Sequence, residues 1–436
     1  MFCLSRIIVT YINQLVILSS MKLLKQVLKE IKPDKQEEKE VKAEIDVFLK
    51  KANKNLKNAK AILGGSGAKD TWLTKAHDAD IFVEFNYNQY RNKSDKLSDI
   101  LEKHLKKNFK KISRLHGSRD YFQIKEKNFT FEVVPILKIN KASEAKNITD
   151  VSPLHANWVK KYKKFADQIR LTKQFCKAQE VYGAESYIKG FSGYICEILT
   201  INYKGFLNLI KYAAKWKDKT VIDVEKYYRN SKEVLKSLNL SKIYSPLVII
   251  DPVQKDRNAA AAVSKEKYSQ FICACKEFLK KPSKEFFKIK EITINDLKKR
   301  AKKDKLILLN ITSSAGKEDI VGSKLLKALE FLEKNLKQND FRVYEKGWRW
   351  DKSKKALFWF IIDKEKLSEC VKWCGPPLRN KFHVNKFKKK YKKTFIEKAR
   401  ICAKIKRKFR EPEKLIKELI KNIYIKEKVK NISLKL

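Results

Sequence analysis

The chain has 436 residues, 43% of them hydrophobic, so it can form roughly two to four domains with buried cores. Its 100 Lys and Arg outnumber 50 Asp and Glu, and the net charge of +50 favours a nucleic-acid partner, with a Lys-rich genome as the alternative explanation. The 8 cysteines form no CxxC pair, which argues against a zinc ribbon and suits a cytoplasmic protein with reduced thiols.

The first twenty residues precede the predicted domains. Residues 2–18 are apolar, but Arg6, Asn13 and Gln14 interrupt them, so the segment is too short and too polar for a transmembrane helix. A cleaved leader is the alternative. Apolar residues recur at helical spacing from Met21 onward, where we expect translation to begin. Residues 1–20 are therefore predicted to be dispensable, and no membrane association is expected.

Residues 21–152 are predicted to form an α/β domain. Helical spacing on both sides of Pro33 predicts two helices, the second reaching about residue 56. A short apolar run then ends in the turn Gly64-Gly65-Ser66. Period-two alternation predicts strands at 79–83 and 129–137, with a polar helix at 94–108 between them. The order of these elements indicates a compact α/β unit.

Three carboxylates are the catalytic candidates. Asp78 and Asp80 are two residues apart, so on a strand they point to the same face and can hold two Mg²⁺ ions. A chance solvated pair is the alternative. Glu132 lies in an apolar strand, where an unpaired charge is costly to bury. We expect Glu132 to be the third metal ligand, with a Lys or Arg partner as the alternative.

The remainder of the chain divides into three predicted parts. Residues 153–282 are mainly helical, with a short buried strand at 246–252. Residues 283–384 alternate strands and helices in an order typical of a ferredoxin-like, split βαβ fold, which includes a helix at 367–373. Residues 385–436 are Lys-rich and are predicted to be a helical, basic tail. The predicted class is therefore α+β and multidomain.

Several segments together resemble the archaeal, class I CCA-adding tRNA nucleotidyltransferases of the polymerase-β-like superfamily. The resemblance runs in order from about residue 21 to residue 409. Its motifs are GGSGAKDTW at 64–72, DAD at 78–80, FEVVP at 131–135, DVSPLH at 150–155, IRLTKQF at 169–175, VYGAE at 181–185, KGFSGYICE at 189–197 and DPVQKDRNAA at 251–260.

The resemblance implies a head, neck, body and tail, and one active site that adds C, C and A to the tRNA 3′ end. CTP and ATP would be the substrates, two Mg²⁺ ions the cofactors and pyrophosphate the leaving product. It also implies nucleotide contacts. Ser66 and Lys69 would lie near the triphosphate, and Arg257, with Asp251, would help to read the base. The sugar and triphosphate would be lined by Ser152, His155, Lys173 and Tyr182.

Two departures from the family pattern bear on the chemistry. Glu132 stands where the family usually has Asp, and Arg119 stands where it often has a triphosphate-binding His. Arg also binds phosphate well, so Arg119 is predicted to make this nucleotide contact. A narrower polymerase, adding only A or making oligoadenylate, and a catalytically inactive tRNA-binding protein are the alternative functions. A homodimer is left open.

Overall fold

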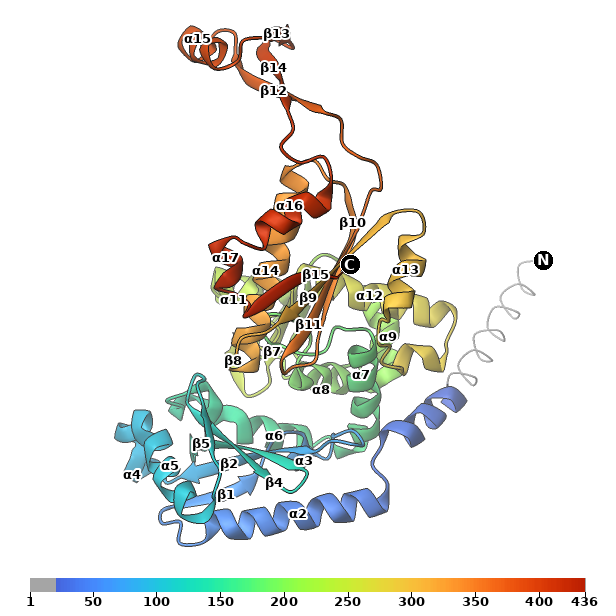
Figure 1. The fold of residues 1–436 in the computed structure, drawn as a ribbon. Coiled ribbons are helices and arrows are strands. Elements are labelled where there is room, and N and C mark those ends of the chain that lie inside the picture. Colours follow the sequence, from blue (N-terminus) through green and yellow to red (C-terminus); the bar gives the residue numbers. More distant parts are fainter. Residues whose placement is uncertain (1–20, 436) are drawn as a thin grey trace, which may run out of the picture. The chain divides into compact units, whose positions relative to one another are not determined.

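The computed structural model describes residues 21–435, which form two compact units that divide after Lys290 (Figure 1). The first unit contains a mixed-sheet head and a mainly helical second domain, and the second contains an antiparallel-sheet body. The predicted α+β multidomain class is therefore confirmed. The extension predicted over residues 1–20 lies outside the described residues. Within residues 21–435, no helix combines the length and the apolar character needed to span a lipid bilayer.

The head is built on one sheet with the strand order β1-β2-β5-β4-β3. β2 and β5 pair in parallel and the other neighbours pair antiparallel. α2 and α5 cover one face of this sheet (Figure 1). On that face the ring of Phe48 stacks on that of Phe131, with ring centroids 3.9 Å apart. The opposite face of β2 and β5 carries the carboxylates. The head elements are α2 (Lys35–Asn53), β1 (Ala59–Leu63), α3 (Gly65–Lys69), β2 (Asp78–Phe85), α4 (Tyr87–Tyr90), α5 (Leu97–Asn108), β3 (Ser113–Leu115), β4 (Tyr121–Glu126) and β5 (Phe129–Leu137).

The second domain packs its helices around aromatic side chains. The ring of Phe175 lies 5.5 Å from that of Phe206 and 5.9 Å from that of Phe278, measured between centroids. α8 is buried from Ile195 to Ile201, and this buried stretch includes the charged residue Glu197. The elements are α6 (Ser152–Lys160), α7 (Ala166–Ala178), α8 (Gly193–Asn202), α9 (Phe206–Ala213), β6 (Thr220–Ile222), α10 (Ser231–Ser237), α11 (Leu240–Ile243), β7 (Leu247–Asp251), β8 (Gln254–Asn258) and α12 (Lys265–Lys280).

The body in the second unit has an antiparallel sheet in the order β10-β11-β9-β15, with α14 and α16 packed in its core. A hairpin module, defined here as residues 370–406, is inserted between β11 and α16 and forms the separate sheet β12-β14-β13. The elements are α13 (Ile294–Ala301), β9 (Lys305–Thr312), α14 (Glu318–Gln338), β10 (Val343–Trp350), β11 (Lys355–Ile362), β12 (Cys370–Pro377), α15 (Lys381–Lys390), β13 (Thr394–Glu397), β14 (Arg400–Lys406), α16 (Pro412–Leu419), α17 (Ile423–Lys426) and β15 (Asn431–Lys435).

The C-terminal part differs from the helical tail predicted over 385–436. That range contains the helices α16 and α17 and the end of α15, but β13 and β14 belong to the hairpin module and β15 pairs with β9 of the body. The helix predicted at 367–373 is also wrong, because this segment runs into β12. Val371 and Trp373 face Ile405 and Ala403 across the strand pair, and such cross-strand packing overrides local helical spacing.

Candidate active site

The three predicted carboxylates lie on neighbouring strands of the head. β2 and β5 are parallel and in register, so Asp80 is the direct partner of Glu132, and Asp78 is the partner of Thr130. Asp78 is exposed, whereas Asp80 and Glu132 are half-buried. The intervening residues of both strands are buried in the head core. Period-two alternation therefore turns all three carboxylates to the face away from α2 and α5.

Negative charge is crowded at Asp80. Burial raises the pKa of the Asp80 carboxyl, and the neighbouring Asp78 raises it further, while Lys69 and Lys173 partly offset the increase. A cation bound between the two aspartates would relieve this repulsion. Residues 21–435 contain no group of three His, Cys, Asp or Glu side chains placed to hold a metal ion. Register brings Glu132 beside Asp80, but its role as a third metal ligand stays a prediction.

The glycine turn after β1 packs directly on Asp80. The Gly64 amide donates a 2.7 Å hydrogen bond to the Asp80 carbonyl. Gly65 has a φ of +53°, and a Cβ on it would lie 1.6 Å from the Asp80 Oδ2 atom. Only glycine therefore allows this close approach. Ser66 follows in α3 and, with Asp78 and Asp80, lines a cavity of 470 Å³ beside α2.

Two predicted nucleotide-binding lysines meet at one carboxylate. Lys69 donates from Nζ to Glu197 Oε2 over 2.7 Å, and Lys173 donates from Nζ to Glu197 Oε1 over 2.8 Å. Thr71 Oγ1 donates to Glu197 Oε1 over 2.9 Å, and Lys173 also contacts Thr71 Oγ1 at 2.8 Å. The side chains of Lys69 and Lys173 are 12% and 4% exposed, and that of Glu197 is fully buried. We call these four residues the lysine–carboxylate cluster.

Burial and pairing oppose each other within this cluster. Burial lowers the pKa of Lys173 below its ordinary value even though Glu197 favours its charged form, and nearby Lys69 lowers the pKa further. Burial alone would raise the pKa of Glu197, but Lys173 and Lys69 hold it below the usual value. The carboxylate is therefore ionised, and the charged state of Lys173 depends on it.

Asp251 joins Arg257, which is predicted to help read the base, to His155, which is predicted to line the sugar and triphosphate. Asp251 is fully buried and accepts hydrogen bonds from His155 Nε2 at 3.0 Å, from Tyr194 Oη at 3.2 Å and from the Arg257 guanidinium. The rings of His155 and Tyr194 lie 4.2 Å apart. Burial would raise the pKa of Asp251, but His155 and Arg257 lower it overall. Asp251 thus orients both His155 and Arg257.

Tyr182 and Ser152 complete the predicted set. A Cβ on Gly193, the first residue of α8, would lie 3.0 Å from the Tyr182 hydroxyl and 3.6 Å from Lys173 Cε, so the tyrosine lies next to the lysine–carboxylate cluster. Burial raises the pKa of Tyr182, which keeps its hydroxyl protonated. Ser152 begins α6, which packs against α3.

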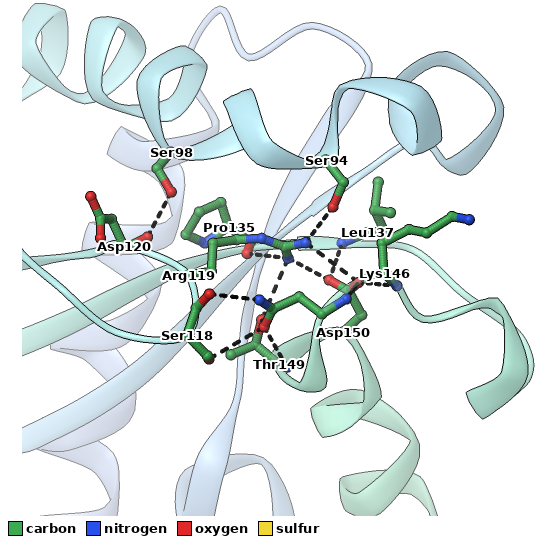
Figure 2. A network of polar contacts seen from close by, with 11 residues as sticks. Ser94, Ser98, Ser118, Arg119, Asp120, Pro135, Leu137, Lys146, Thr149 and Asp150 are labelled. Carbon is green, nitrogen blue, oxygen red and sulfur yellow. Dashed lines mark hydrogen bonds and ion pairs between the residues drawn. The ribbon is translucent and has the colours of Figure 1, made fainter.

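Arg119 is not brought together with these residues. Its guanidinium forms a buried ion pair with Asp150 and donates to the Pro135 carbonyl at 3.0 Å and to Ser94 Oγ at 2.6 Å (Figure 2). Asp150 also accepts hydrogen bonds from the backbone amides of Leu137 and Lys146 (Figure 2) and from that of Asn147. Arg119 therefore braces the loop before α6, and the phosphate contact predicted for it has no support in this arrangement.

Glu197 and Thr71 are the site residues that sequence reasoning missed. α8 is otherwise uncharged, and a lone carboxylate in an apolar helix is costly to bury without partners. That signal was readable in residues 193–202 and pointed to a buried ion pair. Thr71 carried no comparable signal, because a threonine after a helix is common on any surface.

A mixed sheet with paired carboxylates beside a glycine turn defines a nucleotidyltransferase, and the sequence model for a nucleotidyltransferase domain matches residues 45–155. The model for the second domain of tRNA nucleotidyltransferases matches residues 167–288, and that for the C-terminal domain of CCA-adding enzymes matches residues 305–431. The chain belongs to the family of archaeal-type CCA-adding enzymes, which are tRNA nucleotidyltransferases.

Similar proteins align with most of the length of this chain. The CCA-adding enzyme of Nanoarchaeum equitans is 37% identical over 367 residues, which cover 84% of this chain and 88% of that protein. The CCA-adding enzyme of Methanococcus maripaludis strain S2 is 31% identical over 417 residues, which cover 94% and 92%. Among solved structures, a cytoplasmic RNA terminal U-transferase aligns with a TM-score of 0.50 and 14% identity over 63% of this chain and 99% of that chain. This last likeness concerns the fold alone.

Proposed function

We propose that this CCA-adding enzyme uses CTP and ATP to extend the tRNA 3′ end, in the cytoplasm, with the head and the second domain of the first unit binding the nucleotide. The observation that carries the assignment is the pairing of Asp80 with Glu132 beside the Gly64–Gly65 turn. In each step the tRNA 3′ oxygen bonds to the α-phosphorus and loses its proton. The bond to pyrophosphate breaks at the same phosphorus, so positioning and charge neutralisation dominate the catalysis.

The aspartates fit a divalent cation by their chemistry. Both offer oxygen donors on one face of β2, and the crowding of charge at Asp80 favours a cation there. Mg²⁺ bound at this place would neutralise charge on the phosphates and acidify the attacking hydroxyl. Asp78 and Asp80 would hold it, and Glu132 would complete the site from β5. Glu132 has the same charge as the Asp that is usual in the family, but its carboxylate lies one methylene further from the backbone of β5.

The remaining residues have separate tasks. Lys69 and Lys173 would bind the triphosphate, and Tyr182 would donate its protonated hydroxyl to the sugar or a phosphate. Ser66 and Ser152 would donate hydroxyls to the nucleotide. Arg257, held by Asp251, would face the base, where its planar guanidinium can donate two hydrogen bonds at once. His155, held by the same carboxylate, would line the sugar and triphosphate.

The second unit would bind tRNA. Its body has the element order β9-α14-β10-β11-α16-β15 and the strand order β10-β11-β9-β15, which supports the finer description of a ferredoxin-like, split βαβ fold. Lysines concentrate on α15 of the hairpin module. Side chains can reach few base edges in helical RNA, so the second unit would bind tRNA through its phosphates and through the shape of its helices.

The test is nucleotide addition to tRNA that lacks its CCA end, with labelled CTP and ATP and MgCl₂. Gel lengths should show addition of C, C and A followed by arrest, and chelation of Mg²⁺ with EDTA should abolish it. Addition of A alone would identify the narrower polymerase. Tight tRNA binding without any addition would identify an inactive tRNA-binding protein.

A further inference from the structure

The lysine–carboxylate cluster joins two parts of the first unit at the nucleotide site. Lys69 ends α3 of the head, and Thr71 follows it; Lys173 and Glu197 come from α7 and α8 of the second domain. Lys69 belongs to the same short helix as Gly65, which packs directly against the Asp80 carboxylate, so the cluster adjoins that carboxylate. The Glu197 side chain is fully buried, and both its carboxylate oxygens are engaged by the lysines and Thr71.

We propose that Glu197 is a positioning residue for nucleotide addition: its buried carboxylate holds Lys69 and Lys173 side by side as the pair of cations that binds the triphosphate. The proposal rests on the assignment of the two lysines to the triphosphate under the proposed function. Glu197 does not touch the nucleotide, and it acts through the two ammonium groups.

The geometry fixes two side chains that are otherwise flexible. A lysine has a four-carbon stem whose rotamer freedom must be lost when it binds a phosphate. Each ammonium here is tied to its own oxygen of one carboxylate, and Lys173 also donates to the Thr71 Oγ1 atom and to the Thr71 carbonyl. The two lysine side chains have therefore already lost their rotamer freedom in the free enzyme, so the nucleotide binds to a preorganised pair of cations.

The sign of the effect follows from burial. Glu197 could in principle compete with phosphate for the lysines, and its removal would then strengthen nucleotide binding. Lys173, however, is almost fully enclosed, and burial already lowers the pKa of its ammonium with Glu197 in place. Without the carboxylate, the pKa of Lys173 would fall further, which disfavours the charged ammonium that attracts a triphosphate.

The experiment compares Glu197→Gln with wild type in steady-state CTP addition and in inhibition by pyrophosphate, the product that occupies the phosphate subsites. We expect the KM for CTP and the inhibition constant of pyrophosphate to rise together by about tenfold or more, since a charge-assisted contact is lost. The tRNA dissociation constant should stay within about twofold. Asp167→Asn is the matched control, because it removes a carboxylate of the second domain that pairs with Arg170 and Lys32 instead. It should leave both nucleotide constants unchanged.

Unchanged or lowered constants in folded Glu197→Gln would overturn the proposal. If circular dichroism shows that this variant does not fold, the KM for CTP of Glu197→Asp tests the proposal instead. Glu197→Asp keeps the charge but withdraws the carboxylate by one methylene, and a KM for CTP equal to that of wild type would equally overturn the proposal. A wild-type protein that adds no nucleotide would refute the proposed function instead, so the two failures are distinguishable.

Discussion

Replacing Gly65 with alanine tests whether the glycine turn sets the position of Asp80. The new Cβ would lie 1.6 Å from Asp80 Oδ2 and 2.5 Å from its carboxyl carbon, at a φ of +53°. Carbon and oxygen in contact need about 3.3 Å, so the carboxylate or the turn must shift by roughly 1.7 Å. The strained φ adds about 1 kcal/mol to the cost of folding.

A displacement of this size acts on the reacting centre. A misplacement of about 1 Å can lower a rate by about a hundredfold, so we expect kcat for C addition to fall by roughly that factor. Binding of tRNA should not change. The assay is single-nucleotide addition at saturating CTP and tRNA, with thermal melting followed by circular dichroism to separate loss of activity from loss of fold.

Gly67→Ala is the matched control within the same short helix. A Cβ on Gly67 would meet the end of the Leu63 side chain at 3.1 Å, and this flexible methyl group can move away. We expect kcat to stay within about threefold of wild type, since Asp80 is not displaced. The reasoning is refuted if Gly65→Ala retains a kcat close to that of Gly67→Ala.

Four further predictions concern other parts of the chain. Glu132→Gln should nearly abolish addition while Glu132→Asp retains most of it, as gel assays would show; near wild-type rates for Glu132→Gln would make Glu132 a structural residue. Arg119→Met should destabilise the head by about 3–5 kcal/mol in chemical unfolding, because it leaves Asp150 buried without its cation; an unchanged unfolding midpoint would contradict the brace. Replacing the lysines at 388–390 of α15 with glutamines should weaken tRNA binding and flatten its salt dependence in filter assays, without raising the KM for CTP, and a tRNA affinity equal to that of wild type would show that this charge run is merely solvated. Deleting residues 1–20 should leave addition intact, and lost activity would contradict the predicted dispensability.

The sequence predicted the head better than any other part of the chain. The glycine turn and the period-two strands around Asp80 are local patterns, and the strands follow them. The contacts of Arg119, in contrast, could not be predicted from local patterns. Its position in a motif predicts a phosphate contact, whereas in the structure its guanidinium pairs with Asp150, 31 residues away in sequence. Only the tertiary fold could reveal that pairing.

The body shows the same limit for secondary structure. β9, α14, β10 and β11 agree with the alternation of strands and helices predicted over residues 283–384. Residues 367–373 do not, because their apolar spacing fits a helix as well as a strand, and the choice is made by pairing with β14, some thirty residues on. Likewise, the pairing of β15 with β9 joins segments more than a hundred residues apart.

The hairpin module is closed at its base. Leu367 and Arg410 are joined by a hydrogen bond from the Leu367 amide to the Arg410 carbonyl at 3.1 Å and by one from Arg410 Nε to the Leu367 carbonyl at 2.9 Å. The chain thus leaves the body and returns to it at nearly the same point. Insertions, deletions or wholesale replacement between these residues need not disturb the strands on either side. The strand pairing of the body sheet is therefore insulated from the length of the segment that the module adds.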